Sequence, residues 1–135
     1  VDKSHEFGLL VDAYIAHPDD SHIAGIPAET PEDVAKVAKS MEQIGVDMIG
    51  LMTGMTYQGF AAGEINPFVK ERLAALVETV KDVPTLAEGG INLNNYQAFK
   101  GTGIKIIVVG TSFDQLAMKA VSDAVKQYLS LGKRK

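Results

Sequence analysis

The stretch Val83–Ser112 places the tightest constraint on the fold, because it holds two short apolar runs that are both followed by glycine. The first run is Pro84–Ala87, with Gly89-Gly90 shortly after it, and the second is Ile104–Val109, with Gly110 after it. The segment between the two runs has room for one short helix. This order of strand, helix and strand predicts that the two strands run parallel.

Glycine at the end of a strand lets a ligand approach the backbone and leaves N–H groups able to point at it. Thr111 and Ser112 then open the last predicted helix, and the N-terminus of a helix favours anions. We therefore predict that Gly89, Gly90, Gly110, Thr111 and Ser112 bind a phosphate group. The alternative, that the glycines only permit tight turns, stays open.

The same alternation of strand and helix continues upstream of this stretch. The apolar runs Phe7–Ala16 and Val46–Met52 predict two more strands. Thr30 and Asn66, each followed by proline, predict the starts of two long helices. Four strands and four helices in turn predict an α/β domain with a parallel sheet.

Apolar residues at helical spacing predict which side chains the helices bury. For the helix after Thr30 they are Val34, Val37, Ala38, Met41 and Ile44. For the helix after Asn66 they are Val69, Leu73, Leu76, Val77 and Val80. For the last helix, Phe113–Leu129, they are Leu116, Ala117, Ala120, Val121, Ala124, Val125 and Tyr128.

Length and composition limit the class of protein. A complete eightfold βα barrel takes about 200 residues or more, so the 135 residues of this chain fit half of one. The net charge of −4 argues against nucleic-acid binding, and the absence of cysteine excludes disulfides and thiol chemistry. Neither a transmembrane run nor a signal peptide is evident, so we expect no membrane contact and a cytoplasmic protein.

Several polar residues lie where a site could form. Asp12 interrupts a buried strand, where it either faces a site or points outward near the strand end. Thr53 and Gln58 lie in a glycine-rich loop after the second strand, which is either a substrate loop or plain surface. A further loop carries His17, Asp19, Asp20 and His22, a cluster that no fixed spacing brings together as metal ligands.

The strings AEGGINLNN and AFKGTGIKIIVVGTS, together with LLVDAYI and VDMIGLMTGMTYQGFAAGEINPF, resemble the ribulose-phosphate-binding barrels. The similarity is strongest to 3-hexulose-6-phosphate synthase and 3-keto-L-gulonate-6-phosphate decarboxylase, in the orotidine-phosphate decarboxylase superfamily. It covers most of the chain, but only as strands five to eight of a barrel. We therefore expect residues 1–135 to form one α/β domain that is the C-terminal half, (βα)4, of a larger barrel.

The resemblance implies roles for particular residues. Gly89, Gly90 and Gly110, with the backbone of Thr111, match the phosphate cradle, and Asp12 matches an acid that contacts substrate. Three positions differ from the decarboxylase: Met52 replaces a histidine, Met55 an arginine, and Thr111 the arginine that binds phosphate. The Asp-x-Lys-x-x-Asp strand of the family, with its Mg²⁺ ligands, is not in this chain. Mg²⁺ is thus implied for the intact protein, with its ligands mostly outside these residues.

Glu88 is similar to a different family. The string AEGG resembles the Ala-Glu-Gly turn of N-acetylmannosamine-6-phosphate 2-epimerase, in which that glutamate is placed for proton transfer at a sugar carbon. A carboxylate at a barrel mouth can act as an acid or a base if burial raises its pKa. The alternative is that Glu88 only bonds neighbouring amides of the loop.

These observations predict part of a sugar-phosphate lyase, an aldolase or decarboxylase that acts through a Mg²⁺-stabilised enediolate, with Glu88 and Asp12 as catalytic residues. The alternatives are a sugar-phosphate epimerase that uses Glu88, and a non-catalytic, four-stranded, doubly wound binding module. Apolar strands at both open edges of the sheet predict a homo-oligomer or pairing with an N-terminal half barrel. On its own, the chain is expected to be inactive.

Overall fold

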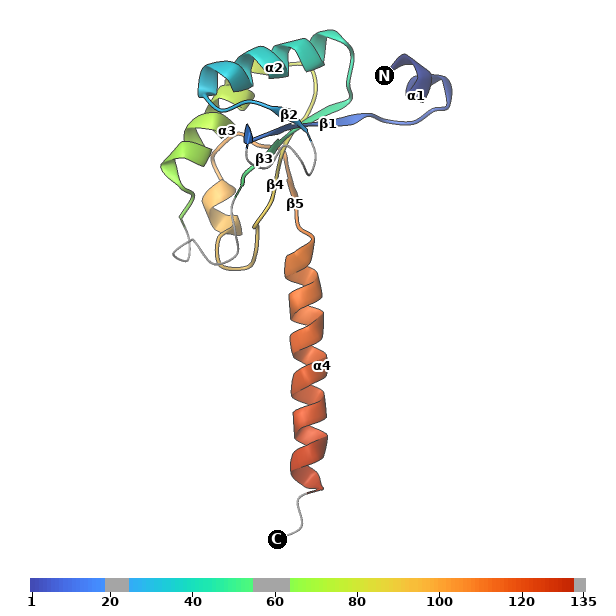
Figure 1. Cartoon of the computed structure of the whole chain (residues 1–135), viewed down its shortest axis with the longest axis vertical. Coiled ribbons are helices and arrows are strands. Elements are labelled where there is room, and N and C mark those ends of the chain that lie inside the picture. Colours follow the sequence, from blue (N-terminus) through green and yellow to red (C-terminus); the bar gives the residue numbers. More distant parts are fainter. Residues whose placement is uncertain (19–24, 55–63, 133–135) are drawn as a thin grey trace.

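The computed structural model describes residues 1–18, 25–54 and 64–132. Its centre is a five-stranded sheet in which all strands are parallel, in the order β2-β1-β3-β4-β5 (Figure 1). The strands are β1 Asp12–Ala16, β2 Ile26–Pro27, β3 Met48–Met52, β4 Thr85–Glu88 and β5 Ile106–Val108. The predicted α/β class is confirmed, and a parallel sheet with flanking helices is consistent with half of a βα barrel.

The helices α2, α3 and α4 begin where the sequence signals place them. The elements are α1 Asp2–Glu6, α2 Pro31–Gln43, α3 Pro67–Thr79, the 3₁₀ helix η2 Tyr96–Phe99, and α4 Thr111–Leu131. At the start of α2 the Thr30 hydroxyl accepts a hydrogen bond from the Asp33 N–H at 3.1 Å, in a capping box. At the start of α3 the Asn66 amide oxygen accepts one from the Phe68 N–H at 2.9 Å.

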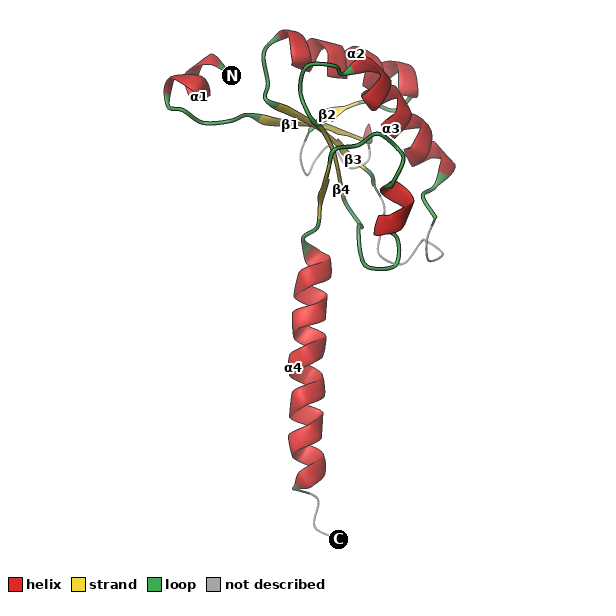
Figure 2. Ribbon diagram, turned by 180° about the vertical axis from the view of Figure 1, so that it is seen from behind, coloured by secondary structure: helices red, strands yellow, loops and turns green. Residues whose placement is uncertain are grey.

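The core lies between one face of the sheet and the layer formed by α2 and α3, which lie side by side (Figure 2). Ile15, Ile49 and Leu51 point to this face and are fully buried. Because side chains alternate along a strand, the intervening residues face the other side. That second face carries Asp12, Tyr14, Met48, Gly50, Met52, Leu86, Glu88, Ile106 and Val108.

Two features near the N-terminus differ from the prediction. The strand expected from Phe7 begins only at Asp12, because α1 precedes it and Gly8 turns the chain in a left-handed conformation with φ 69°. As a result Leu10 is 73% exposed instead of buried. The two residues of β2 were not predicted, because so short a strand has no periodic pattern of its own and forms only by pairing with β1.

The last helix is the largest departure from the prediction. All seven residues expected to face inward from α4 are exposed, among them Val121 at 66% and Tyr128 at 78%. The helix continues away from the carboxyl end of β5 and does not fold back on the sheet (Figure 1). Helical spacing identified its apolar face correctly, but spacing contains no information on what covers a face. The same applies on a smaller scale to Ile44, predicted buried at the end of α2 and 63% exposed.

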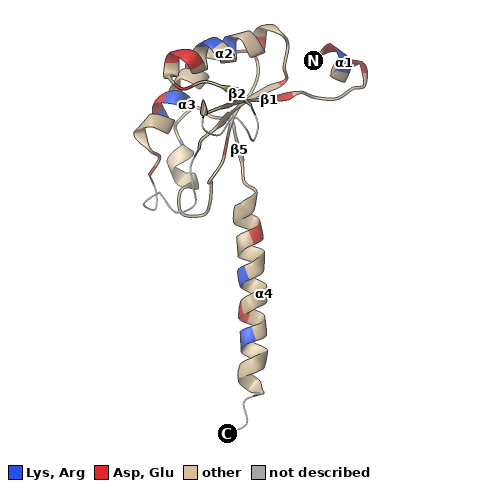
Figure 3. Ribbon diagram, viewed as in Figure 1, with Lys and Arg blue, Asp and Glu red and all other residues tan. Residues whose placement is uncertain are grey.

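Charged residues are distributed differently on α2 and on α4. The outer side of α2 carries acidic and basic residues together, whereas charges along α4 are few and widely spaced (Figure 3). Across the residues that the structure describes, none of the helices combines the length and the hydropathy needed to cross a membrane.

Candidate phosphate and proton-transfer site

The ends of β4 and β5 and the start of α4 enclose a cleft of about 120 Å³. Its lining comprises Met52, Glu88, Gly89, Gly90, Ile91, Val108, Gly110 and Thr111. Two segments separated by a whole strand and a 3₁₀ helix thus meet at the carboxyl edge of the sheet, where parallel α/β folds bind ligands. A cavity of this size holds several waters or one small anionic group.

Hydrogen bonds to its carbonyls fix the Gly89-Gly90 turn. The Thr53 hydroxyl donates to the Gly89 carbonyl at 2.7 Å, and the Thr53 N–H donates to the Glu88 carbonyl, also at 2.7 Å. Both glycines have left-handed backbones, with φ 104° for Gly89 and 65° for Gly90, which other residues adopt at a cost. Thr53, predicted as a substrate contact, is buried and supports this turn with its hydroxyl.

Two asparagines hold the other side of the same turn. The side-chain amides of Asn92 and Asn95 donate to the Gly90 carbonyl at 3.1 and 2.9 Å, and the Asn95 amide oxygen accepts from the Asn92 N–H at 2.8 Å. In a trans peptide the N–H points opposite to the carbonyl. Fixing the carbonyls of Gly89 and Gly90 therefore also fixes the N–H groups of Gly90 and Ile91, two residues of the cleft lining.

The predicted phosphate residues after β5 divide into two groups. Gly110 and Thr111 line the cleft, and the first turn of α4 brings the positive end of its helix dipole there. Ser112 is buried and lines neighbouring cavities beside Asn92 and Leu93 instead. Gly110 differs from the other glycines of the cleft, because its φ is −114° and a Cβ added there would meet no atom within 4 Å.

Glu88, Tyr14 and Asp12 lie on the same face of the sheet. Burial raises the pKa of Tyr14, and side-chain hydrogen bonding to Glu88 and Asp12 raises it further. Burial likewise raises the pKa of Asp12; its hydrogen bond with Tyr14 opposes that rise, and the negative charge of Glu88 adds to it. The two predicted catalytic carboxylates lie on strands that β3 separates.

Tyr14 was not predicted as a site residue, although the sequence contains one signal for it. Residues two apart on a strand share a face, so Tyr14 had to lie on the same side as Asp12. The register places Asp12 level with Met48 and Glu88 level with Met52, four residues further along β3. Each residue adds about 3.3 Å along a strand, so Asp12 lies well toward the amino end of the sheet relative to Glu88. Along the strand direction, Tyr14 lies between Asp12 and Glu88.

Gln58, Asp19, Asp20 and His22 fall outside the described residues, and the ring of His17 stacks edge-on against Phe68 with centroids 5.6 Å apart. Among the residues that the structure does describe, no group of three or more His, Cys, Asp or Glu side chains is placed to hold a metal ion.

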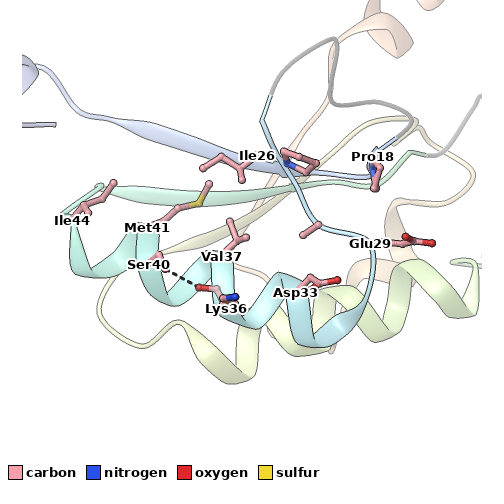
Figure 4. Close-up of a pocket in the computed structure, with 11 residues that line it drawn as sticks. Pro18, Ile26, Glu29, Asp33, Lys36, Val37, Ser40, Met41 and Ile44 are labelled. Carbon is pink, nitrogen blue, oxygen red and sulfur yellow. Dashed lines mark hydrogen bonds between the residues drawn. The ribbon is translucent and has the colours of Figure 1, made fainter.

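A larger cavity, of about 600 Å³, lies on the other side of the sheet, between β2 and α2 (Figure 4). Ile26, Val37 and Met41 provide its apolar lining, and Glu29, Asp33 and Lys36 stand along it. The Ser40 hydroxyl there donates to the Lys36 carbonyl at 3.0 Å, within α2. None of the predicted site residues lines this larger cavity. The candidate site is the smaller cleft, which cavity volume alone would not have identified.

Comparison with models of protein families finds no match, and comparison with curated proteins finds none either. The resemblance to sugar-phosphate barrels therefore stays a prediction, and the geometry of the cleft carries the functional proposal.

Proposed function

We propose that this chain supplies the phosphate-binding end, and one proton-transfer group, of an enzyme that acts on a phosphorylated sugar. One observation carries the proposal: Glu88 and the glycine turns after β4 and β5 line the same cleft. The backbone N–H groups of the turns and the N-terminus of α4 suit the phosphate. The carboxylate then lies within the same cleft, where the carbon chain of the sugar would follow.

The reaction we propose first is the making or breaking of a carbon–carbon bond next to a carbonyl, as in the hexulose-6-phosphate synthase type of lyase. Such a reaction passes through an enediolate, whose negative charge needs electrostatic support. In the family that the sequence resembles, Mg²⁺ gives that support. Among the described residues no group of three or more His, Cys, Asp or Glu side chains is placed to hold a metal ion, and we assign no step to a metal here.

A second candidate is a sugar-phosphate epimerase, which the presence of Glu88 in the lining of the cleft favours. Epimerisation removes a proton from one carbon and returns it to the opposite side, which requires an acid–base group at the sugar. A held carboxylate can serve in that role. Both candidates share a phosphate site and differ in what Glu88 does.

Phosphate binding is tested first, because both the lyase and the epimerase candidate require it. Binding of inorganic phosphate is followed by NMR shifts of backbone amides in the wild-type chain and in Gly110→Leu. The substitution fits the open space at Gly110 and should crowd the cleft without unfolding the chain, so we expect at least a tenfold loss of affinity (about 1.4 kcal/mol). Gly132→Leu at the far end of α4 is the control. Equal phosphate affinity in Gly110→Leu and the wild type would refute the site.

A second experiment, on the intact protein with a sugar phosphate, distinguishes the lyase from the epimerase. If Glu88 transfers the proton at the epimerised carbon, Glu88→Gln should abolish exchange of solvent deuterium into the sugar. Exchange that continues near the wild-type rate would remove the epimerase candidate and leave the lyase. Phosphate binding without exchange or turnover in the intact protein would favour the non-catalytic binding module.

The proposal includes a partner for the open side of the molecule. β5 lies at the edge of the sheet, and its Ile106 and Ile107 are 37% and 39% exposed. An apolar edge strand of this kind is suited to pairing with another strand. A second copy of the chain, or an N-terminal half barrel, would provide that strand. Only a half barrel of different sequence could also supply the Asp-x-Lys-x-x-Asp strand that this chain lacks.

A further inference from the structure

A second cavity, of about 320 Å³, lies beside the candidate cleft. It is formed by residues 92–94 and by the first part of α4, and we call it the α4 cavity. The cleft is lined by Ile91 and Thr111, and the α4 cavity by the next residue of each segment, Asn92 and Ser112. Because consecutive Cα atoms are only about 3.8 Å apart, the two cavities are adjacent.

Ser112 is the buried polar residue of the α4 cavity. Only 7% of its surface is exposed, and it lines the cavity. Within the part of the chain that the structure describes, no hydrogen bond joins the Ser112 hydroxyl to another residue. Buried hydroxyls in folded proteins nearly always have a hydrogen-bond partner, because leaving one unpaired costs free energy. The hydroxyl is therefore placed to bond a polar group that enters the cavity.

The start of α4 adds positive potential next to this hydroxyl. The N-cap residue is Gly110, which has no side chain to accept hydrogen bonds from the N–H groups of the first turn. The helix is 21 residues long, and its dipole places partial positive charge at this end. The uncapped N–H groups and the dipole together favour an anion near Ser112.

The other polar side chains of the lining are all able to donate hydrogen bonds. On α4, Gln115 and Lys119 follow Ser112 by three and seven residues, so these side chains share one face of the helix. Asn94 contributes a side-chain amide from the 92–94 segment. None of the described residues that line the cavity carries a carboxylate. A lining of donors with one cation matches an anionic ligand.

The acidic residues of α4 leave the cavity accessible to an anion. Lys119 Nζ lies 2.6 Å from Asp123 Oδ2, but this ion pair is exposed to solvent, and exposed pairs are weak. Asp123 also has Lys126 at 4.0 Å, so Lys119 can turn toward a bound anion while a second cation stays beside Asp123. Asp114 follows Ser112 by two residues, which places it on a different side of the helix.

We propose that the α4 cavity is a second anion site, which binds a phosphate or carboxylate group through the Ser112 hydroxyl, the Gln115 amide and the Lys119 ammonium. This inference goes beyond the proposed function, because it requires neither the cleft nor a reaction at Glu88. The anion is either a free ion or a second anionic group of the sugar phosphate in the cleft. In the latter case, which rests on the proposed function, the substrate class is a sugar that carries two anionic groups.

Inorganic phosphate tests the site without any sugar. Phosphate is titrated into the full chain at constant ionic strength, which holds non-specific screening fixed, and the NMR shifts of backbone amides are followed. We expect one group of shifts at Gly90 and Ile91, from the cleft, and a second group at Asn94 and Gln115. The two groups should saturate at different phosphate concentrations, and the second should persist in Gly110→Leu, the variant that crowds the cleft.

Lys119→Met removes the charge and keeps an unbranched side chain. It should weaken the binding that the second group of shifts reports about fivefold, because a charge-assisted hydrogen bond to phosphate is lost. Lys126→Met is the matched control, because Lys126 lies on the same helix and its side chain is 74% exposed, as is that of Lys119. It should weaken neither group. Ser112→Ala should weaken the second group and leave the cleft affinity unchanged.

Two sugars identify the source of the anion. Fructose 6-phosphate and fructose 1,6-bisphosphate are the probes, in the same titration. If one molecule fills both cavities, the bisphosphate should shift both groups of amides in a single step, and Gly110→Leu and Lys119→Met should each weaken its binding. If the α4 cavity takes a free ion, the bisphosphate should shift the two groups in separate steps, as inorganic phosphate does.

Phosphate shifts confined to Gly90 and Ile91 would overturn the second anion site. Equal losses of affinity in Lys119→Met and Lys126→Met would overturn it too, because they would show only a general attraction of anions to the helix. The reverse pattern, with shifts at Asn94 and Gln115 alone, would refute the proposed function and support this site. The failure of one proposal is therefore distinguishable from the failure of the other.

Discussion

The ring of Tyr14 lies over Gly50 on the neighbouring strand, in the space that any larger residue of β3 would fill. Tyr14 and Gly50 pair across neighbouring strands, so the packing at this point depends on both residues. Leu86 closes over the same glycine from β4. Gly50 is thus constrained on both sides by side chains and not by its own backbone, because it is not among the glycines with positive φ.

Gly50→Ala should destabilise the chain by about 1–3 kcal/mol, the usual cost of overpacking a filled site. The added methyl must displace the Tyr14 ring or the Leu86 side chain. Chemical denaturation measures the resulting loss of stability. Gly132→Ala, where the added methyl would make only ordinary contacts, is the control, and equal stabilities of the two variants would contradict the packing described.

Asn95→Ala should loosen the Gly89-Gly90 turn. Asn95 is buried, and its side chain bonds the Gly90 carbonyl and the Asn92 N–H. Leaving these groups unpaired should cost about 1–3 kcal/mol and weaken phosphate binding as the turn becomes mobile. The exposed neighbour Asn94→Ala serves as the comparison in thermal denaturation. If both variants melted alike and bound phosphate alike, the asparagines would not support the turn.

Glu42 should make folding stability depend on pH in the acid range. Its carboxylate accepts hydrogen bonds from the N–H groups of Lys81 and Asp82, both at 2.8 Å, and these bonds lower the pKa of Glu42, with that from Asp82 the larger cause. A carboxyl with a lowered pKa in the folded state stabilises it above the unfolded pKa of about 4.3. That stabilisation is lost as the pH falls through the lower, folded value.

Glu42→Gln should therefore be less stable than the wild type at pH 7, with the difference shrinking as the pH is lowered below about 4. Urea unfolding at a series of pH values measures this. The exposed Glu78→Gln on α3 is the matched control. A difference between Glu42→Gln and the wild type that stays constant down to pH 3 would show that the charge of Glu42 has no part in it.

The purified chain should associate with itself at micromolar concentration. Phe113, Val121 and Val125 expose 64%, 66% and 51% of their surface on α4, and continuous apolar faces of this kind are rarely left in water. Val121→Lys should shift the equilibrium toward monomer, whereas Ser122→Lys, one residue further on the polar side, should not. Sedimentation velocity distinguishes the species, and a stable wild-type monomer would contradict the expectation.

The sequence alone identified the long helices and the strands of the glycine-ended stretch. Thr30 and Asn66 mark the starts of α2 and α3, because capping depends on residues a few positions apart. The apolar spacing in α3 identified Val69, Leu73 and Leu76 as buried. The glycine-ended runs gave β4 and β5, and parallel pairing brought Gly89-Gly90 and Gly110 to one cleft, as predicted.

Tertiary structure decided whatever depends on partners distant in sequence. The position of the Tyr14 ring depends on Gly50, which lies on another strand, and the support of the glycine turn by Thr53 depends on a contact across 36 residues. The direction of α4 is set by the chain at Gly110 and not by the apolar spacing of the helix. Periodicity shows which face of an element is apolar, whereas only the packed chain determines what that face contacts.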